Sequence, residues 1–125
     1  MALSEENREW KPLDKGRSAV SQLAECAVIN ETAARVVETG IWDVALPVMT
    51  GPQVAALDTF EKALSGLRDG TAALVCAVRA APDADLGRVI TLPWGTAKLA
   101  DVFLMPLWNM SYHEGQINYI GTLLA

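Results

Sequence analysis

The only histidine of this 125-residue chain, His113, lies in a stretch of polar and aromatic residues near the C-terminus. Asn109 precedes it by four positions and Gln116 follows it by three, a spacing that places all three side chains on one helix face. A polar group on an otherwise apolar helix face needs a partner, because burying it unpaired costs free energy. These three side chains are therefore candidates for a functional site on a helix over residues 97–124.

A single histidine restricts the chemistry that this site can support. Zinc and nickel sites usually take three or four nitrogen, sulfur or oxygen ligands. The chain has no Gly-x-Ser-x-Gly nucleophile motif, phosphate-binding loop, dinucleotide-binding fingerprint or Cys-x-x-Cys pair. Cys26 and Cys76 lie in helix-like apolar sequence, which favours buried free thiols over a disulfide. Taken alone, His113 is most simply a hydrogen-bonded core residue.

The composition predicts a single folded domain, residues 1–125, that binds neither nucleic acid nor membranes. The net charge is −5 and the basic residues are scattered, so no basic patch exists to neutralise phosphates. The apolar runs are far shorter than the ~20 residues that cross a bilayer, and the acidic N-terminus differs from a secretory signal. These features predict a cytoplasmic protein. Hydrophobic residues make up 51% of the chain, which favours apolar surface buried against a partner.

Hydrophobic periodicity predicts three long helices, over residues 18–39, 52–81 and 97–124. Ser18 and Thr96 are the expected N-caps of the first and last helices, because their hydroxyl oxygens can accept hydrogen bonds from free backbone N–H groups. Proline at the first position of the middle helix suits a helix start, and glycine after the first helix suits a helix end. The fold class expected is all-α.

Single residues predict further features of these helices. Gly66 and Gly70 are four positions apart on one face, which favours a close helix contact or a local bend over a ligand site. Pro106 lies inside the last helix and removes one backbone hydrogen-bond donor. Residues 40–50 are predicted to form an irregular apolar connection, and residues 86–95 an extended one.

Several short segments follow, in the same order, the pattern of the DinB-like (YfiT-like) superfamily of four-helix-bundle proteins. The segments with this resemblance are Trp10-Lys11-Pro12, Leu23-Ala24-Glu25-Cys26-Ala27, Leu92-Pro93-Trp94-Gly95 and Asn109 to Gln116. The last segment resembles the family motif His-x-x-x-His-x-Gly-Gln, whose two histidines bind a divalent metal. Here His113 is the second histidine and Asn109 replaces the first.

The resemblance implies a DinB-like helical bundle with three metal positions. Glu25 stands where the family has a further metal-binding histidine, so the positions correspond to Glu25, Asn109 and His113. Glutamate is a competent ligand for hard or borderline metals, whereas a neutral asparagine amide is a poor zinc donor and better suited to hydrogen bonding. We therefore expect a degenerate site that binds a divalent metal, zinc or nickel, weakly or not at all.

Two classes of function are open at this stage. The first is a metal-free or weakly metal-binding protein that binds a small molecule or acts as an oligomer. The second, implied by the resemblance, is a divalent-metal-dependent thiol S-transferase or hydrolase. In that enzyme His113 and Glu25 would hold the metal, and Asn109 would orient a water or the substrate. The sequence does not indicate the substrate.

Aromatic residues next to the histidine are candidates for a ligand pocket. Trp108, Tyr112 and Tyr119 are spaced by four and seven positions and form one stripe of the last helix. Helix-spaced aromatics are more often core or interface residues than ligand-lining ones, and we favour packing for Tyr119. Trp108, Tyr112 and Gln116 are the predicted pocket residues beside His113.

The resemblance also leads us to expect a homodimer. Family members have a helix before the Trp10–Pro12 segment, where this chain has nine residues. A bundle without that helix exposes an apolar groove, and soluble proteins bury apolar surface of that extent. A second copy would cover the groove. The alternative is that Trp42, Trp94 and the two connections fold across it.

Overall fold

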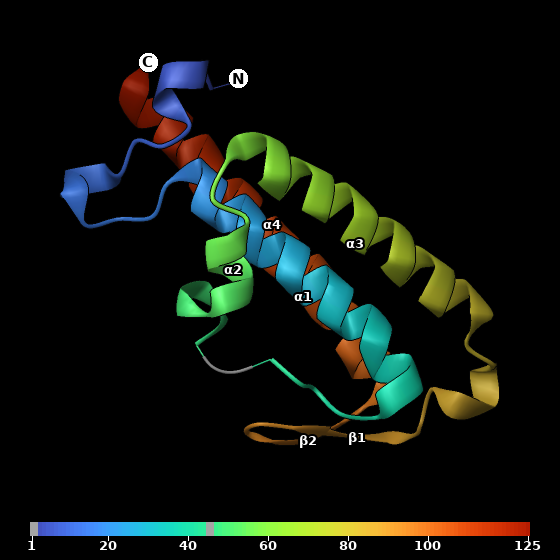
Figure 1. The fold of residues 1–125 in the computed structure, drawn as a ribbon. Helices are drawn as coiled ribbons and strands as arrows, with labels where there is room; N and C mark the ends of the chain where they lie inside the picture. The colour runs from blue at the N-terminus through green and yellow to red at the C-terminus, as the bar shows by residue number, and fades with distance from the viewer. Residues whose placement is uncertain (1–2, 45–46) are drawn as a thin grey trace.

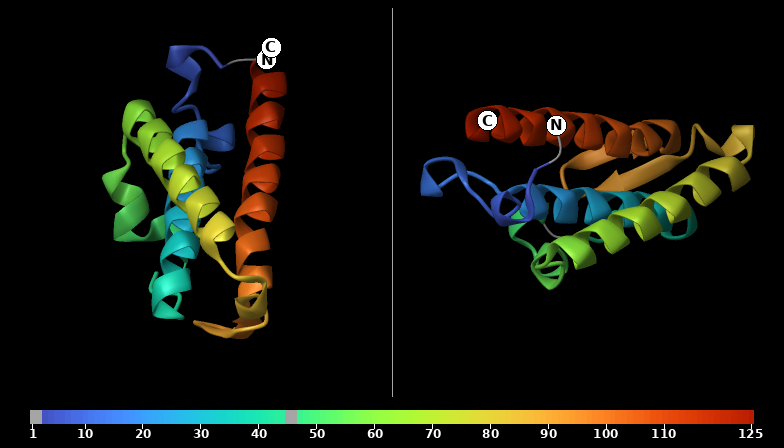
Figure 2. Two further views of the ribbon diagram at one scale, coloured as in Figure 1. Left: turned by 90° about the vertical axis from the view of Figure 1, so that its right-hand side faces the viewer. Right: turned by 90° about the horizontal axis from the view of Figure 1, so that it is seen from above.

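Three long helices make up most of the computed structural model, which describes residues 3–44 and 47–125. α1 (Ala19–Thr39) lies between α3 (Phe60–Ala80) and α4 (Leu99–Leu124) and contacts both (Figures 1 and 2). A short helix, α2, a two-stranded hairpin and short 3-10 helices complete the fold, so the predicted all-α class is confirmed. The 3-10 helices span Glu5–Asn7, Pro12–Asp14, Val48–Thr50 and Asp83–Asp85.

Both predicted ends of α1 are confirmed. The Ser18 hydroxyl accepts a hydrogen bond from the backbone N–H of Ser21 at 3.2 Å, as an N-cap does. Gly40 ends the helix with a φ of 69°, a left-handed conformation that glycine adopts without steric strain. Between these ends α1 buries residues all around its axis, because other elements pack on several of its flanks. The buried residues are Ala19, Val20, Gln22, Ala24, Cys26, Ala27, Val28, Asn30, Thr32, Ala33 and Val36.

Glycines let α3 approach α1 closely, as the sequence predicted. A Cβ atom at Gly70 would lie 2.9 Å from the carbonyl oxygen of Ala27 and 3.2 Å from the backbone nitrogen of Glu31. A Cβ atom at Gly66 would lie 3.3 Å from a methyl carbon of Leu57 and 3.4 Å from the Ala27 Cβ. The Gly70 contact is the tighter of the two, since it involves backbone that a side chain cannot displace easily.

The prediction of one continuous helix over residues 52–81 is wrong. α2 begins at Pro52, as predicted, but spans only Pro52–Ala56. Leu57 then leaves the helical conformation, with φ −97° and ψ 52°. The Thr59 hydroxyl accepts a hydrogen bond from the backbone N–H of Lys62 at 3.2 Å and starts α3 as an independent helix. Thr59 was the only sequence signal for the start of α3, because helical periodicity continues across the break.

The connection that we predicted as extended over residues 86–95 contains a β-hairpin. β1 (Val89–Leu92) pairs antiparallel with β2 (Gly95–Lys98), and the hairpin lies at one end of the helices (Figure 1). The β-branched residues of β1 favour a strand over an irregular connection. Thr96 lies in β2, so its predicted role as an N-cap is wrong, and α4 begins at Leu99.

The start of the first connection is hydrogen-bonded to β1, next to the hairpin at one end of the helices (Figure 1). The backbone N–H of Trp42 donates to the carbonyl of Thr91 at 3.0 Å, and the backbone N–H of Thr91 donates to the carbonyl of Gly40 at 3.1 Å. Trp42 is buried and contacts Trp94 edge to face, with ring centroids 6.1 Å apart. Within the predicted irregular connection over 40–50, residues 45–46 lie outside the described residues.

Both cysteines are free, as predicted, but they differ in exposure. Cys26 is buried in α1, whereas Cys76 is exposed on α3, so the predicted burial of Cys76 is wrong. α3 packs on α1 through one narrow flank, which leaves Cys76 outside that contact. Pro106 lies inside α4 as predicted. In the described part of the chain, no helix combines the length and apolarity needed to cross a membrane.

Gly70→Ala tests the contact between α1 and α3. A glycine-to-alanine change in a helix ordinarily stabilises by up to ~1 kcal/mol. Here the new methyl group meets the Ala27 carbonyl, and overpacking of this kind costs about 1–3 kcal/mol. We expect a lower free energy of unfolding by urea. Ala72→Gly, at an exposed position of the same helix, is the control and should cost ~1 kcal/mol through helix propensity alone. A Gly70→Ala variant more stable than the wild type would contradict the close contact.

Candidate functional site

The three predicted site residues converge between α1 and α4. Glu25 extends from α1, and Asn109 and His113 lie one turn apart on α4. Asn109 Nδ2 donates to Glu25 Oε1 at 3.4 Å, and His113 Nε2 lies 3.4 Å from the same oxygen. Asn109 and His113 are both buried, so the three groups form a polar cluster in the helix interface. We call Glu25, Asn109 and His113 the α1–α4 cluster.

Two glutamines contact the other nitrogen of the histidine ring. His113 Nδ1 lies 3.0 Å from Gln22 Oε1 and 2.9 Å from Gln116 Oε1. The Gln22 amide is oriented by its nitrogen, which donates to the carbonyl of Arg17 at 3.4 Å. Because amide oxygens only accept hydrogen bonds, we assign the proton to Nδ1. Nε2 then faces Glu25 Oε1 and can donate a hydrogen bond to this carboxylate only when both ring nitrogens carry a proton.

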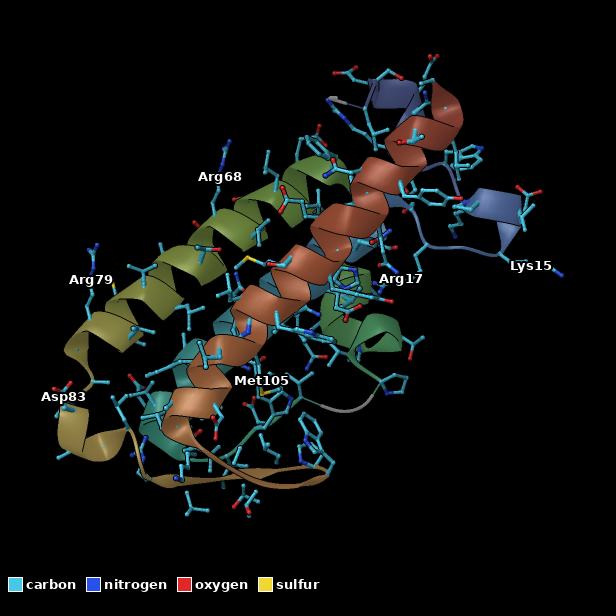
Figure 3. The ribbon with its side chains drawn as sticks, turned by 180° about the vertical axis from the view of Figure 1, so that it is seen from behind. Lys15, Arg17, Arg68, Arg79, Asp83 and Met105 are labelled. Atoms are coloured by element: carbon cyan, nitrogen blue, oxygen red, sulfur yellow. The ribbon has the colours of Figure 1, made fainter. Side chains whose placement is uncertain are left out.

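Arg17 supplies a positive charge to the cluster. Its Nη1 lies 2.5 Å from Glu25 Oε2, and its Nη2 donates to the carbonyl of Ser21 at 3.0 Å. Burial raises the pKa of Glu25, but the contact with His113 and the charge of Arg17 outweigh burial and lower the pKa to about 2. The carboxylate is therefore ionised at neutral pH. Figure 3 shows Arg17 on the flank of α4 that is turned away from α3.

Three buried polar atoms of the cluster have no hydrogen-bond partner among the described residues. Glu25 Oε2 is compensated by its ion pair with Arg17, whereas Asn109 Oδ1 and His113 Nε2 have no such compensation. A buried polar atom without a partner costs roughly 1–3 kcal/mol. Such atoms are typical of sites that bind a further group.

A surface pocket of about 560 Å³ adjoins the cluster on the side of Gln22 and Gln116. Its lining residues are Pro12, Gly16, Arg17, Gln22, Tyr112, Gly115, Gln116, Tyr119 and Ile120. Of the three residues predicted to form a ligand pocket, Tyr112 and Gln116 line this surface pocket and Trp108 does not. Trp108 is 69% exposed and stacks on Tyr112 with ring centroids 5.7 Å apart.

Sequence reasoning missed Arg17 and Gln22 as parts of the site. Gln22 precedes Glu25 by three positions, so its place on the same helix face could have been found from spacing. Arg17 lies before the N-cap of α1, where no helical periodicity applies. Its ion pair depends on the course of the preceding segment, which the local sequence does not determine.

The divalent metal implied by the family resemblance does not fit these residues well. The cluster has one imidazole, one carboxylate and one neutral amide, fewer strong donors than zinc or nickel sites usually have. In the described residues, no group of three or more His, Cys, Asp or Glu side chains is placed to hold a metal ion. The carboxylate already pairs with Arg17, whose charge would repel a cation.

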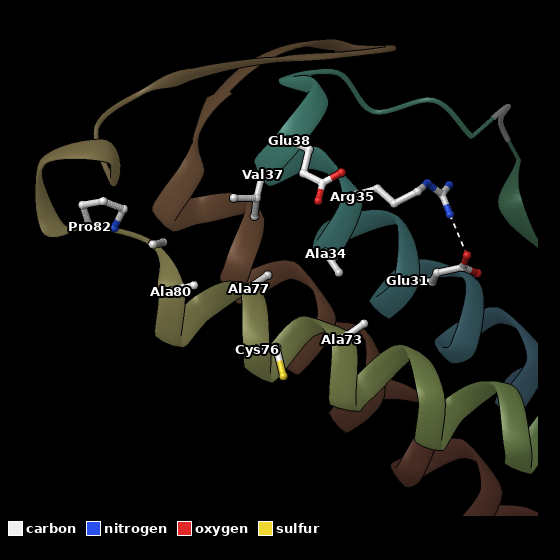
Figure 4. A pocket seen from close by; sticks show the side chains of 11 residues that line it. Glu31, Ala34, Arg35, Val37, Glu38, Ala73, Cys76, Ala77, Ala80 and Pro82 are labelled. Carbon is white, nitrogen blue, oxygen red and sulfur yellow. Dashed lines mark hydrogen bonds and ion pairs between the residues drawn. The ribbon is translucent and has the colours of Figure 1, made fainter.

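A second surface pocket, of about 620 Å³, lies between the C-terminal halves of α1 and α3 (Figure 4). Alanines form much of its wall, and the charged residues at its edge include Arg35 and Glu31, which form an ion pair at 2.8 Å. It lies at the other end of α1 from the cluster and is lined by none of the residues that contact the cluster, whereas Arg17, Gln22 and Gln116 line the other pocket. We therefore place the candidate site at the pocket beside His113.

Comparison with known proteins gives no family assignment for the chain. No protein-family model, no curated protein and no solved structure matches it. The DinB-like resemblance therefore rests on the short sequence segments and their order.

Glu25→Gln tests the charge state of the cluster. Because the pKa of folded Glu25 is about 2 and its ordinary value is 4.5, the ionised carboxylate stabilises the fold above pH 4.5. That stability is lost as the pH falls towards 2. Allowing for solvent screening, we expect the wild type to exceed the variant by about 1–2 kcal/mol at pH 6 and the difference to shrink by pH 2.5.

Urea denaturation at both pH values measures this difference. Glu114→Gln is the control, since it removes an exposed negative charge next to His113. A difference between wild type and Glu25→Gln that stays constant from pH 6 to pH 2.5 would contradict the ion pair.

Proposed function

We propose that this chain is a DinB-like bundle protein that binds a small molecule without a metal. The observation that carries the proposal is the ion pair between Arg17 and Glu25, at 2.5 Å. The guanidinium supplies the positive charge that a divalent metal supplies in the related bundles. The α1–α4 cluster then lies behind the pocket and orients Arg17, Gln22 and Gln116, which line it, rather than forming a metal centre.

The pocket next to the cluster favours a ligand with an apolar body and a polar group. Tyr112, Tyr119 and Ile120 offer apolar and aromatic surface, and Gln116 offers amide hydrogen bonds. Ligand pockets commonly combine an apolar lining with a few oriented polar groups. The two free cysteines suit a reducing compartment, which supports the cytoplasm as the place of action.

The alternative is a divalent-metal-dependent enzyme, a thiol S-transferase or hydrolase. One observation favours it, since Asn109 Oδ1 and His113 Nε2 are both buried and without partners beside Glu25. In that case His113 and Glu25 would hold the metal, which would supply Lewis-acid activation of a thiol or water. The metal would first have to displace Arg17 from the carboxylate.

Metal titration by calorimetry separates these two functions. We expect the wild type to bind zinc or nickel weakly, because it has one strong nitrogen donor. The double variant Glu25→His, Asn109→His restores two nitrogen donors and removes the partner of Arg17, so its affinity should rise by at least ~100-fold. Ser21→His, a solvent-accessible position on α1, controls for binding by added histidine alone. Equal and tight binding by the wild type and the double variant would favour the enzyme.

Benzamide and benzyl alcohol are probes for the small-molecule pocket, since each joins an aromatic ring to a hydrogen-bonding group. For ligands of this size we expect dissociation constants of about 1 mM. Titration followed by backbone amide NMR should give saturable shifts at Gly16 and Gln116. Ala77, in the pocket between α1 and α3, is the internal control. Equal shifts in both pockets, or none at Gly16 and Gln116, would contradict the proposal.

A further inference from the structure

α4 carries a stripe of exposed apolar side chains along its length. The exposed fractions are 60% for Leu104, 69% for Trp108, 52% for Tyr112, 63% for Tyr119 and 49% for Leu123. These residues, which we call the α4 stripe, recur at helical spacing and share one face. Isolated exposed apolar residues are ordinary, but a continuous stripe of this length is typical of an interaction surface.

The spacing of the stripe is symmetric about its centre. With Gly115 included, successive positions are separated by four, four, three, four and four residues. Reversing the direction of the helix therefore reproduces the same spacing. A surface that matches its own reverse fits a second copy of itself related by a two-fold axis, because the same patch lies on both sides of such an interface.

We propose that α4 pairs with α4 of a second copy in antiparallel orientation through this stripe. The two-fold axis passes between the two helices at the level of His113 and Glu114. The positions that face one another across the axis are Leu104 and Leu123, Trp108 and Tyr119, and Tyr112 and Gly115. The contact runs from Leu104 to Leu123, about 28 Å of helix.

Gly115 supplies the space that one of these pairs requires. A Cβ atom at Gly115 would have no heavy atom within 4 Å, so the surface above this residue is open in a single copy. Tyr112 of the second copy lies opposite this opening in the proposed register. A large side chain facing a glycine is the arrangement that allows helix surfaces to interlock.

Area and charge both favour a second copy as the occupant. Aromatic side chains carry about 150–250 Å² each, so the three aromatics of the stripe expose roughly 350 Å². With the two leucines the stripe offers on the order of 500 Å² per copy, and two copies reach the ~1,000 Å² of a specific interface. Glu114 is the only Asp, Glu, Lys or Arg between Leu104 and Ala125, and His113 is buried, so a charged partner would find little to pair with.

The pairing also bears on the pocket beside His113. Tyr112, Gly115 and Tyr119 belong both to the pocket lining and to the proposed interface. Trp108 and Tyr112 of the second copy would then cover the outer edge of the pocket. This consequence rests on the proposed function, whereas the pairing of the helices does not.

Trp108→Glu and Leu107→Glu form a matched pair that tests the interface. Leu107 is 61% exposed, like Trp108, but points about 100° away around the helix and off the stripe. By sedimentation velocity we expect the wild type to be a dimer at micromolar concentration. Trp108→Glu should raise the dimer dissociation constant by roughly 100-fold or more, because each dimer loses two buried aromatic contacts. Leu107→Glu should change it less than about threefold.

Gly115→Leu is a second variant whose effect is separable from misfolding. A side chain has room there in a single copy and improves helix propensity, so circular dichroism should show undiminished helix content. The leucine would occupy the place of Tyr112 of the second copy, and the dimer should weaken at least tenfold. A monomeric wild type, or equal weakening by Leu107→Glu and Trp108→Glu, would overturn the pairing. Unchanged benzamide binding by monomeric Trp108→Glu would overturn only the shared pocket and leave the proposed function intact.

Discussion

The ion pair between Arg17 and Glu25 keeps the carboxylate of the polar cluster between α1 and α4 ionised. Glu25 projects into a helix interface, where an ionised carboxylate needs a compensating charge. Arg17 provides that charge from the segment before α1, at 2.5 Å, and the pKa of Glu25 falls to about 2 despite burial. With the carboxylate ionised, Asn109 and His113 have an acceptor to face, and the glutamines orient the other side of the imidazole.

Because α1 lies between α3 and α4, one polar side chain of α1 can form hydrogen bonds to both helices. Asn30 of α1 is completely buried and donates both to the Thr71 hydroxyl of α3, at 2.9 Å, and to the Met110 sulfur of α4, at 3.3 Å. α1 therefore connects to both other long helices through side chains of its own. α4 also exposes Leu104, Trp108, Tyr112, Tyr119 and Leu123, apolar side chains that its contact with α1 leaves uncovered.

Helix ends and site residues could be predicted from the sequence where they depend only on residues nearby in the chain. Ser18 and Gly40 bound α1 because capping depends on neighbouring backbone groups, and the spacing of Asn109 and His113 fixed their common face. The break before Thr59 and the hairpin could not be found from helical periodicity, because a single capping residue and a short β-branched run decide them. Arg17 reaches Glu25 through the path of the preceding chain, and the exposure of Trp108 depends on which flank of α4 packs on α1. Both are tertiary properties.

Metal analysis of the protein purified without an affinity tag tests the central claim most directly. If Arg17 takes the place of the metal, protein isolated from cells and exchanged into chelator-free buffer should contain zinc and nickel at far less than one equivalent per chain. The same preparation should show the His113 imidazole with its proton on Nδ1 by nitrogen NMR. About one equivalent of a single divalent metal per chain would contradict the account. If chelation removed that metal and also changed the nitrogen NMR signals of His113, the α1–α4 cluster would be identified as a metal site.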